Sequence, residues 1–342
     1  MVSRSGSLPR YILQRVLLII PMVWILLTMV FLLMRVAPGD PVSASLGGRL
    51  TEEAMDQRRA AMGLDRPLLT QYFEYLAGVM RLDLGTTISD SRPITDIVVE
   101  NGGATLTLSV AALVIALLIG IPGGLLAGRF RDSAGDVGLR IFGIITYATP
   151  VFFTGILAQL LVAEYGGDWP TSGASSPITE FTVQARTHIL LLDAVLMADW
   201  GAVLEILQYL ALPALTLGLL ICGIFIRLIR VNVLQTLQGD YVEAARARGV
   251  RESKVVRSHA FRNALVPVVT VIGLQVALLM AGAVLTEKTF NWPGLGSELI
   301  DYIELRDYAA VQGIITVFAL VVVLVSLTID IVTALIDPRV RY

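Results

Sequence analysis

The chain is poor in the residues that build disulfides, metal sites and nucleotide-binding loops. Its 342 residues include one cysteine, two histidines and, among 26 basic residues, only two lysines. Cys222 has no second cysteine to pair with, and His188 and His259 are too few and too far apart in sequence to predict a zinc site. Because neither Lys254 nor Lys288 follows a glycine-rich phosphate-binding loop, any ATP hydrolysis has to take place on another chain, and no cofactor is expected in this one.

Charged residues are also scarce. They make up 16% of the chain, whereas 55% is hydrophobic and the mean hydropathy is +0.74, a balance typical of membrane proteins. Six apolar runs are long enough to be transmembrane helices: 16–34, 104–127, 141–163, 210–226, 265–286 and 309–335. The first is too long for the apolar core of a signal peptide. We therefore predict an all-α polytopic protein with six helices in a lipid bilayer.

The basic residues predict its orientation. With the N-terminus inside, 16 of the 26 arginines and lysines fall in the short inner segments, and 21 of the 28 acidic residues fall outside. Inner loops of membrane proteins carry this excess of positive charge, so both termini are predicted to be cytoplasmic. The overall net charge is −2, and no nucleic-acid partner is expected.

Three regions follow from these spans. Residues 1–35 are the cytoplasmic N-terminus and the first span, 36–103 are a long extracytoplasmic insertion, and 104–342 are a five-helix core. Within the insertion, 51–62 and 68–82 read as helices, the first with Thr51 as N-cap.

The later outer loops are less regular. Three acidic residues interrupt 189–210, so we predict an interfacial helix pair there instead of a span. Residues 287–308 form the last outer loop, with turns at 292–296. Pro150 lies inside the third predicted span.

The most informative stretch is 240–267, which is polar, basic and placed between two spans. Residues 241–248 favour a short helix, Gly249 is typical of the left-handed residue that ends one, and 253–264 favour a second helix. Asn263 and Pro267 mark its turn into the next span. Such a hairpin has little of its own to bury, so we expect it to enter a groove on another protein. The alternative is a basic loop that only sets topology.

This stretch resembles the EAA loop of ABC-transporter permeases, through Glu243-Ala244-Ala245 and, after three residues, Gly249. The general pattern of a Leu-Pro about thirteen residues after the glycine is absent. The spacing of His259, Asn263 and Pro267 is instead similar to the dipeptide/oligopeptide/nickel importer branch. Two further segments resemble that branch: Gly63-Leu64-Asp65-x-Pro67-Leu68 and Leu212-Pro213-Ala214-x-Thr216-Leu217-Gly218. The residues that the resemblance assigns to coupling are Glu243, Ala244, Ala245, Gly249, His259, Asn263 and Pro267.

The resemblance implies a fold like that of type I ABC importer permeases and a place in a bacterial inner membrane. It implies four kinds of partner: a second homologous permease, two ABC ATPase subunits that bind Mg-ATP, an extracytoplasmic substrate-binding protein and the bilayer. The chain itself is then no enzyme. Dipeptides or oligopeptides are the expected substrates, with nickel or another small polar solute as the alternative.

Polar residues within the spans are few. Gln159 and Gln275 are candidates for the substrate pathway, and hydrogen bonds between helices are the alternative for both. Apart from Asp330, the spans hold almost no ionisable group, which speaks against a secondary transporter with a charged relay. No cluster of catalytic residues indicates a membrane enzyme.

Overall fold

The computed structural model describes residues 8–36, 41–46, 51–251, 254–255 and 261–336, and this part of the chain is built from helices. In place of a sheet it contains only an isolated bridge between Thr86 and Pro93. The helices are α1 (Leu8–Val36), α2 (Pro41–Leu46), α3 (Glu52–Ala61), α4 (Leu68–Met80), α5 (Ile94–Arg129), α6 (Ala134–Ala148), α7 (Val151–Tyr165), α8 (Pro177–Thr182), α9 (Leu190–Leu196), α10 (Trp200–Leu237), α11 (Asp240–Ala247), α13 (Phe261–Phe290), α14 (Leu295–Glu304) and α15 (Tyr308–Ile336).

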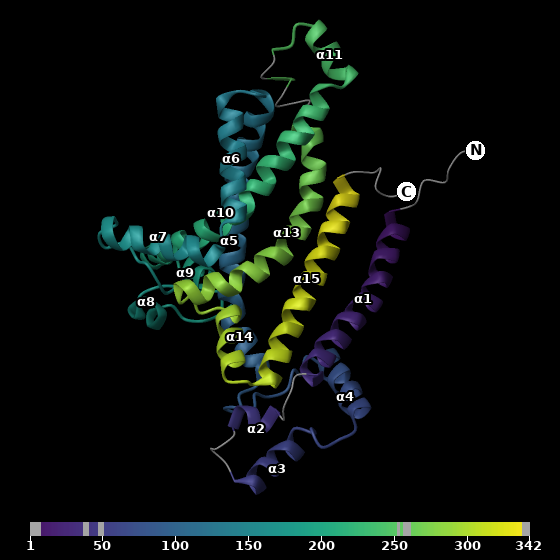
Figure 1. Ribbon diagram of the computed structural model, residues 1–342, viewed down its shortest axis with the longest axis vertical. Helices are drawn as coiled ribbons and strands as arrows, with labels where there is room; N and C mark the ends of the chain where they lie inside the picture. Colours follow the sequence, from purple (N-terminus) through teal and green to yellow (C-terminus); the bar gives the residue numbers. More distant parts are fainter. Residues whose placement is uncertain (1–7, 37–40, 47–50, 252–253, 256–260, 337–342) are drawn as a thin grey trace, which may run out of the picture.

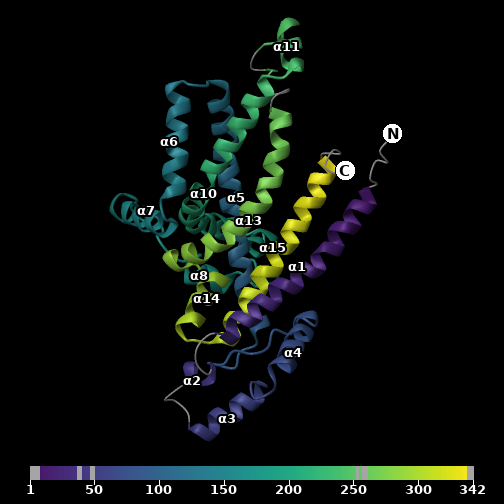
Figure 2. The same ribbon diagram turned by 45° about the vertical axis from the view of Figure 1, so that its right-hand side comes forward.

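Long apolar helices dominate the molecule (Figure 1). Of the described residues, α1, α5, α10 and α15 each make a helix long and apolar enough to cross a membrane, and the bent pair α6 and α7 is a fifth candidate. The 30-residue α13 covers the run predicted as the fifth span. In both views α1 and α15 lie side by side, and Arg15 binds Asp330 between them at 3.0 Å (Figure 2).

The closest helix packing joins α5 to α10 along a row of glycines. A Cβ atom on Gly124 would lie 2.6 Å from the Cβ of Ile229 and 2.9 Å from the carbonyl oxygen of Ile226. On Gly120 it would lie 2.5 Å from the Cβ of Phe225. Small residues at every fourth position let two membrane helices approach to backbone distance, where dispersion contacts are dense. The row consists of Gly120, Gly124 and Gly128.

The third predicted span is not one continuous helix. The chain breaks between α6 and α7 and turns through 104°. Pro150 is the N-cap of α7, and its ring and missing N–H prevent α6 from continuing. The inner part, α6, packs backbone to backbone on α10, because a Cβ on Gly223 would lie 2.5 Å from the carbonyl oxygen of Gly143. The sequence indicated a proline inside a span and missed the sharp bend.

Two outer segments also differ from expectation. The predicted interfacial pair at 189–210 consists of α9 and the start of α10, which runs without interruption into the fourth predicted span. Asp193 on α9 is buried and accepts hydrogen bonds from the backbone N–H groups of Arg186 and Thr187 at 3.2 and 2.9 Å. Burial alone would raise the pKa of the Asp193 carboxyl, but the hydrogen bond from the Thr187 hydroxyl at 2.8 Å and these two backbone bonds together lower that pKa.

The last predicted outer loop contains a helix, α14, directly after the turn at 292–294. Glu287 belongs to α13 and is fully buried, and it accepts the backbone N–H groups of Gly296 and Ser297 at 2.7 and 3.0 Å. Trp292 is buried too, with its indole N–H bonded to the carbonyl oxygen of Ala104 at 3.0 Å. The carboxylate thus stabilises the N-terminus of α14, and the tryptophan is a core residue.

The insertion carries the two predicted helices, and Thr51 caps α3 as predicted by accepting the backbone N–H of Ala54. Its last ten residues belong to α5, which begins at Ile94. Asp307, at the start of α15, is buried and accepts hydrogen bonds from the backbone of Ile88 and Ser89 at 2.7 and 2.8 Å. This carboxylate therefore joins the insertion to the last long helix, as does the hydrogen bond between the hydroxyl groups of Tyr75 and Thr316 at 2.7 Å.

Gly124→Ala tests the glycine row. The added methyl has no room between α5 and Ile229, and overpacking of this kind costs about 1–3 kcal/mol. We expect a lower midpoint of thermal unfolding for the protein in detergent. Gly138→Ala is the control, because nothing lies within 4 Å of a Cβ at that helical site and alanine favours a helix over glycine. Equal unfolding of both variants would show that the row does not hold α5 to α10.

Candidate functional site

The hairpin that begins at α11 stands at one end of the molecule. In both views α11 projects beyond the ends of α5 and α6, at the end of the long axis opposite to α2, α3 and α4. The 38-residue α10 leads into the hairpin, and Gly239 is the N-cap of α11. The hairpin is therefore carried on an extension of the central helix and is accessible from outside the helix bundle.

The two faces of α11 have different surroundings. Val242 and Ala245 are buried in a small cluster with Val255, whereas Glu243 and Ala244 are exposed. Of the two alanines assigned to coupling, Ala245 packs within the hairpin itself, so its small side chain serves internal packing. Glu243 and Ala244 form the outward face.

Gly249 ends α11 with a φ of +74°, the left-handed conformation predicted for it. Its N–H donates to the carbonyl oxygen of Arg246 at 2.9 Å, and the N–H of Val250 donates to that of Ala245 at 3.2 Å. These two bonds are the pair that defines a Schellman C-cap, in which the glycine position requires positive φ. The turn also brings Val250 back onto the buried cluster.

The remaining predicted hairpin residues have different outcomes. His259 lies outside the described residues, as does most of the predicted second helix at 253–264. Asn263 and Pro267 fall within α13, which runs without a break from Phe261. The predicted turn into the span at these two residues is therefore wrong, and their roles in coupling stay predictions.

An ion pair fixes the base of this extension. Asp136 in the first turn of α6 is fully buried and accepts two hydrogen bonds from Arg230 of α10, at 2.6 and 2.7 Å. Arg140 is a second cation, 3.6 Å away, and the backbone N–H of Asp132 donates to the same carboxylate at 2.9 Å. A bidentate pair with further donors is the geometry in which a buried carboxylate is well compensated.

The two candidate pathway residues lie in different places. Gln159 on α7 donates from Nε2 to the carbonyl oxygens of Thr171 and Thr289, at 2.9 and 3.1 Å, so it joins α7 to the outer loop and to α13. These bonds favour the alternative role that the sequence left open for it. Gln275 on α13 is buried, and its Oε1 has no hydrogen-bond partner among the described residues.

Comparison with known proteins identifies the class. The family "Binding-protein-dependent transport system inner membrane component" matches residues 120–342, and its N-terminal companion, "Binding-prot-dependent transport system membrane comp, N-term", matches residues 8–111. The chain belongs to this family of membrane permeases.

Similar proteins cover almost its whole length. The dipeptide transport system permease protein DppB of Escherichia coli K12 is 38% identical over 97% of this chain and 99% of that protein. The di/tripeptide transport system permease protein DppB of Pseudomonas aeruginosa UCBPP-PA14 is 37% identical over 97% and 98%. The glutathione transport system permease protein GsiC of Escherichia coli O6:H1 is 34% identical over 97% and 99%.

Arg230→Met tests the ion pair. It removes the partner that donates two hydrogen bonds to a buried carboxylate, a change that costs about 3–5 kcal/mol. We expect a clearly lower midpoint of thermal unfolding, partly restored when Asp136→Asn is added. Asp132→Asn, which alters an exposed pair with Arg131, should change unfolding by no more than ~1 kcal/mol. Wild-type unfolding of Arg230→Met would exclude a structural role for the pair.

Proposed function

We propose that this chain is the transmembrane permease subunit of an ATP-driven ABC importer for dipeptides or oligopeptides, and that it forms the substrate pathway with a second homologous permease. The observation that carries the proposal is the full-length similarity to two permeases named for dipeptide and di/tripeptide transport. An alignment over nearly the whole of both chains includes the insertion, the helix core and the hairpin together.

The hairpin at 240–267 is the coupling element of this proposal. Two ATPase subunits, which bind Mg-ATP, each grip the hairpin of one permease. The exposed face of α11 with Glu243 and Ala244 supports this, and so does the rigid C-cap at Gly249, because a docking helix needs a fixed exit from its groove. The exposed Arg246 of α11 and Arg248 directly after it set topology, in keeping with the basic inner loops.

Six spans with both termini in the cytoplasm complete the proposal. The apolar α13 supplies the sixth span beside the four long helices and the bent pair. Figure 1 supports opposite sides of the membrane for α11 and for the insertion, because they lie at opposite ends of the long axis. The insertion then faces an extracytoplasmic substrate-binding protein in a bacterial inner membrane.

The direct test is uptake. The chain, the second permease and the ATPase subunits are reconstituted in proteoliposomes with the binding protein on the outside. ATP-dependent accumulation of a labelled dipeptide, not inhibited by excess nickel, is the expected result. Accumulation of nickel without peptide would contradict the proposed substrate and favour nickel. Accumulation without ATP would contradict the assignment to ATP-driven importers and favour a secondary transporter.

Gly249→Val is expected to abolish ATP-driven uptake at normal membrane levels. A β-branched residue at a φ of +74° is strongly disfavoured, so the C-cap opens and α11 loses its position. The measurements are uptake, ATPase activity and co-purification of the ATPase subunits. Glu243→Ala, which changes one side chain on the outward face, should give a milder defect.

Gly249→Asn is the matched control for this prediction. Asparagine tolerates left-handed torsions far better than valine, so this variant should retain most of the uptake. Wild-type uptake by Gly249→Val at equal expression would mean that the loop is only a topology signal.

Topology is tested by thiol labelling in a Cys222→Ser background. Thr70→Cys on α4 and Ala247→Cys on α11 are both at exposed positions. A membrane-impermeant maleimide should label position 70 in intact cells and position 247 only after the membrane is opened. Labelling of position 247 from outside would contradict the six-span orientation.

A further inference from the structure

The break between α6 and α7 leaves a backbone carbonyl group without its helical hydrogen bond, and lipid chains have no donor to offer it. Because Pro150 has no N–H, the carbonyl oxygen of Thr146 lacks the hydrogen bond that a continuous helix would give it. The 15 residues of α6 extend about 22 Å at 1.5 Å per residue, less than the roughly 30 Å of the apolar layer. With α6 starting at the inner surface, the break lies at membrane depth. Irregular backbone is tolerated there only where protein buries it or where it lines a water-filled cavity.

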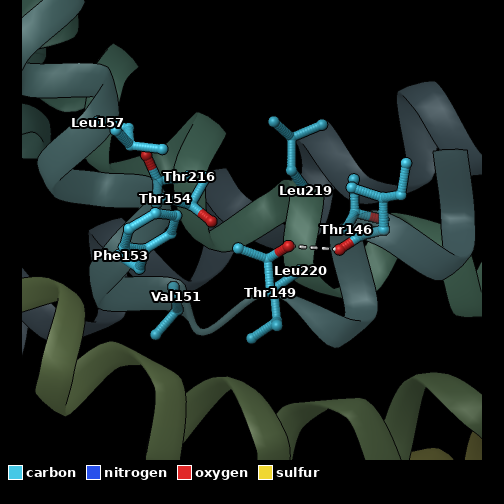
Figure 3. A pocket seen from close by; sticks show the side chains of 10 residues that line it. Thr146, Thr149, Val151, Phe153, Thr154, Leu157, Thr216, Leu219 and Leu220 are labelled. Carbon is cyan, nitrogen blue, oxygen red and sulfur yellow. Dashed lines mark hydrogen bonds between the residues drawn. The ribbon is translucent and has the colours of Figure 1, made fainter.

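A cavity does lie at the break. Its volume is about 280 Å³, many times the ~10–15 Å³ of such volume that one water needs. Apolar side chains form most of its wall, but α6, α7 and α10 contribute four hydroxyl groups, and the described lining has no charged side chain (Figure 3). The hydroxyl groups are those of Thr146, Thr149, Thr154 and Thr216.

All four hydroxyl groups act as hydrogen-bond donors to the backbone of their own helix or turn. Each donates its proton to a carbonyl oxygen three or four residues earlier in the chain, at 2.7 Å for Thr149, 2.9 Å for Thr216, 3.2 Å for Thr146 and 3.3 Å for Thr154. A hydroxyl oxygen that has used its proton keeps lone pairs that accept hydrogen bonds. The cavity therefore offers acceptors, and it suits a ligand that carries N–H donors.

We propose that this cavity is a binding site in the transport pathway for the N-terminal ammonium and amide N–H groups of a peptide. The proposal rests on the proposed function. Every peptide carries these donors whatever its side chains are, and neutral acceptors do not select for side-chain charge. The site thus fits a carrier of varied short peptides. Neither Gln159 nor Gln275 is among the lining residues. The residues proposed to line the pathway are therefore the threonines, in place of the two glutamines predicted from the sequence.

Isosteric substitutions test the acceptors. Thr149→Val and Thr216→Val keep the shape of the side chain and remove one oxygen each. We expect the KM for a dipeptide in reconstituted uptake to rise about tenfold for each, the effect of one lost hydrogen bond to a charged donor. Thr328→Val is the matched control: it is an exposed threonine on α15 whose hydroxyl donates to the carbonyl oxygen of Leu324 at 2.8 Å, and its KM should stay the same.

Accessibility tests the cavity independently of transport. In a Cys222→Ser background, Thr149→Cys should react with a water-soluble, charged methanethiosulfonate, and the dipeptide Gly-Gly should slow the reaction. Thr328→Cys should not react, because Thr328 is outside the cavity and lies in a helix that the six-span proposal places in the apolar layer.

The outcomes separate the two proposals. An unreactive Thr149→Cys, together with a wild-type KM in both valine variants, would overturn the cavity as a solute site in a complex that still imports peptide. A reactive thiol that Gly-Gly does not protect would overturn peptide as its ligand. Failure of the wild-type complex to import any peptide would instead refute the proposed function.

Discussion

The approach of α5 to α10 at backbone distance is the contact on which the rest of the structure depends. It is close because one helix presents glycines where the other presents Phe225 and Ile229. In a membrane there is little hydrophobic gain from helix association, so density of contact has to provide the stability. With α5 on one side, α10 presents Gly223 to α6 and Leu217 to α13, and the other core helices are arranged around it.

This arrangement allows the third span to be broken. A helix that stops in the apolar layer needs neighbours that hold both halves, and α6 is held by Gly143 on Gly223 and by the pair of Asp136 with Arg230. The second half, α7, is held differently, through Gln159 and its bonds to two carbonyl oxygens. Rigid supports on either side of Pro150 keep the cavity open without any covalent constraint.

The sequence predicted the helical class, the apolar runs and the left-handed glycine, because each depends on local chemistry. Apolar length indicates a span whatever surrounds it, and Gly249 follows a helix-forming segment that has to end. The break at Pro150 was harder to predict, since a proline in a membrane helix is compatible with a mild bend or with a full stop. Which of the two occurs depends on whether neighbouring helices leave a cavity for the freed backbone.

Other features depended on partners distant in the sequence. Glu287 was predicted to begin the last outer loop, and its donors at Gly296 and Ser297 become apparent only when α14 folds back. The burial of Trp292 likewise depends on a distant partner, the carbonyl oxygen of Ala104. A readable signal was missed as well: the glycines at 120, 124 and 128 follow the four-residue spacing of close helix pairs. The threonines of the cavity carry no such signal, because in sequence they are ordinary helix residues.

Asp307 fastens the insertion to the helix core. Its carboxylate holds the backbone of Ile88 and Ser89 with one oxygen and the N–H of Ala310 with the other, at 2.7, 2.8 and 3.0 Å. The loop before α5 and the first turn of α15 are therefore one rigid joint. From this joint α15 runs on for 29 residues, about 44 Å at 1.5 Å per residue. Its other end carries Asp330, whose ion pair with Arg15 at 3.0 Å ties α15 to α1, so α15 is fastened near both of its ends.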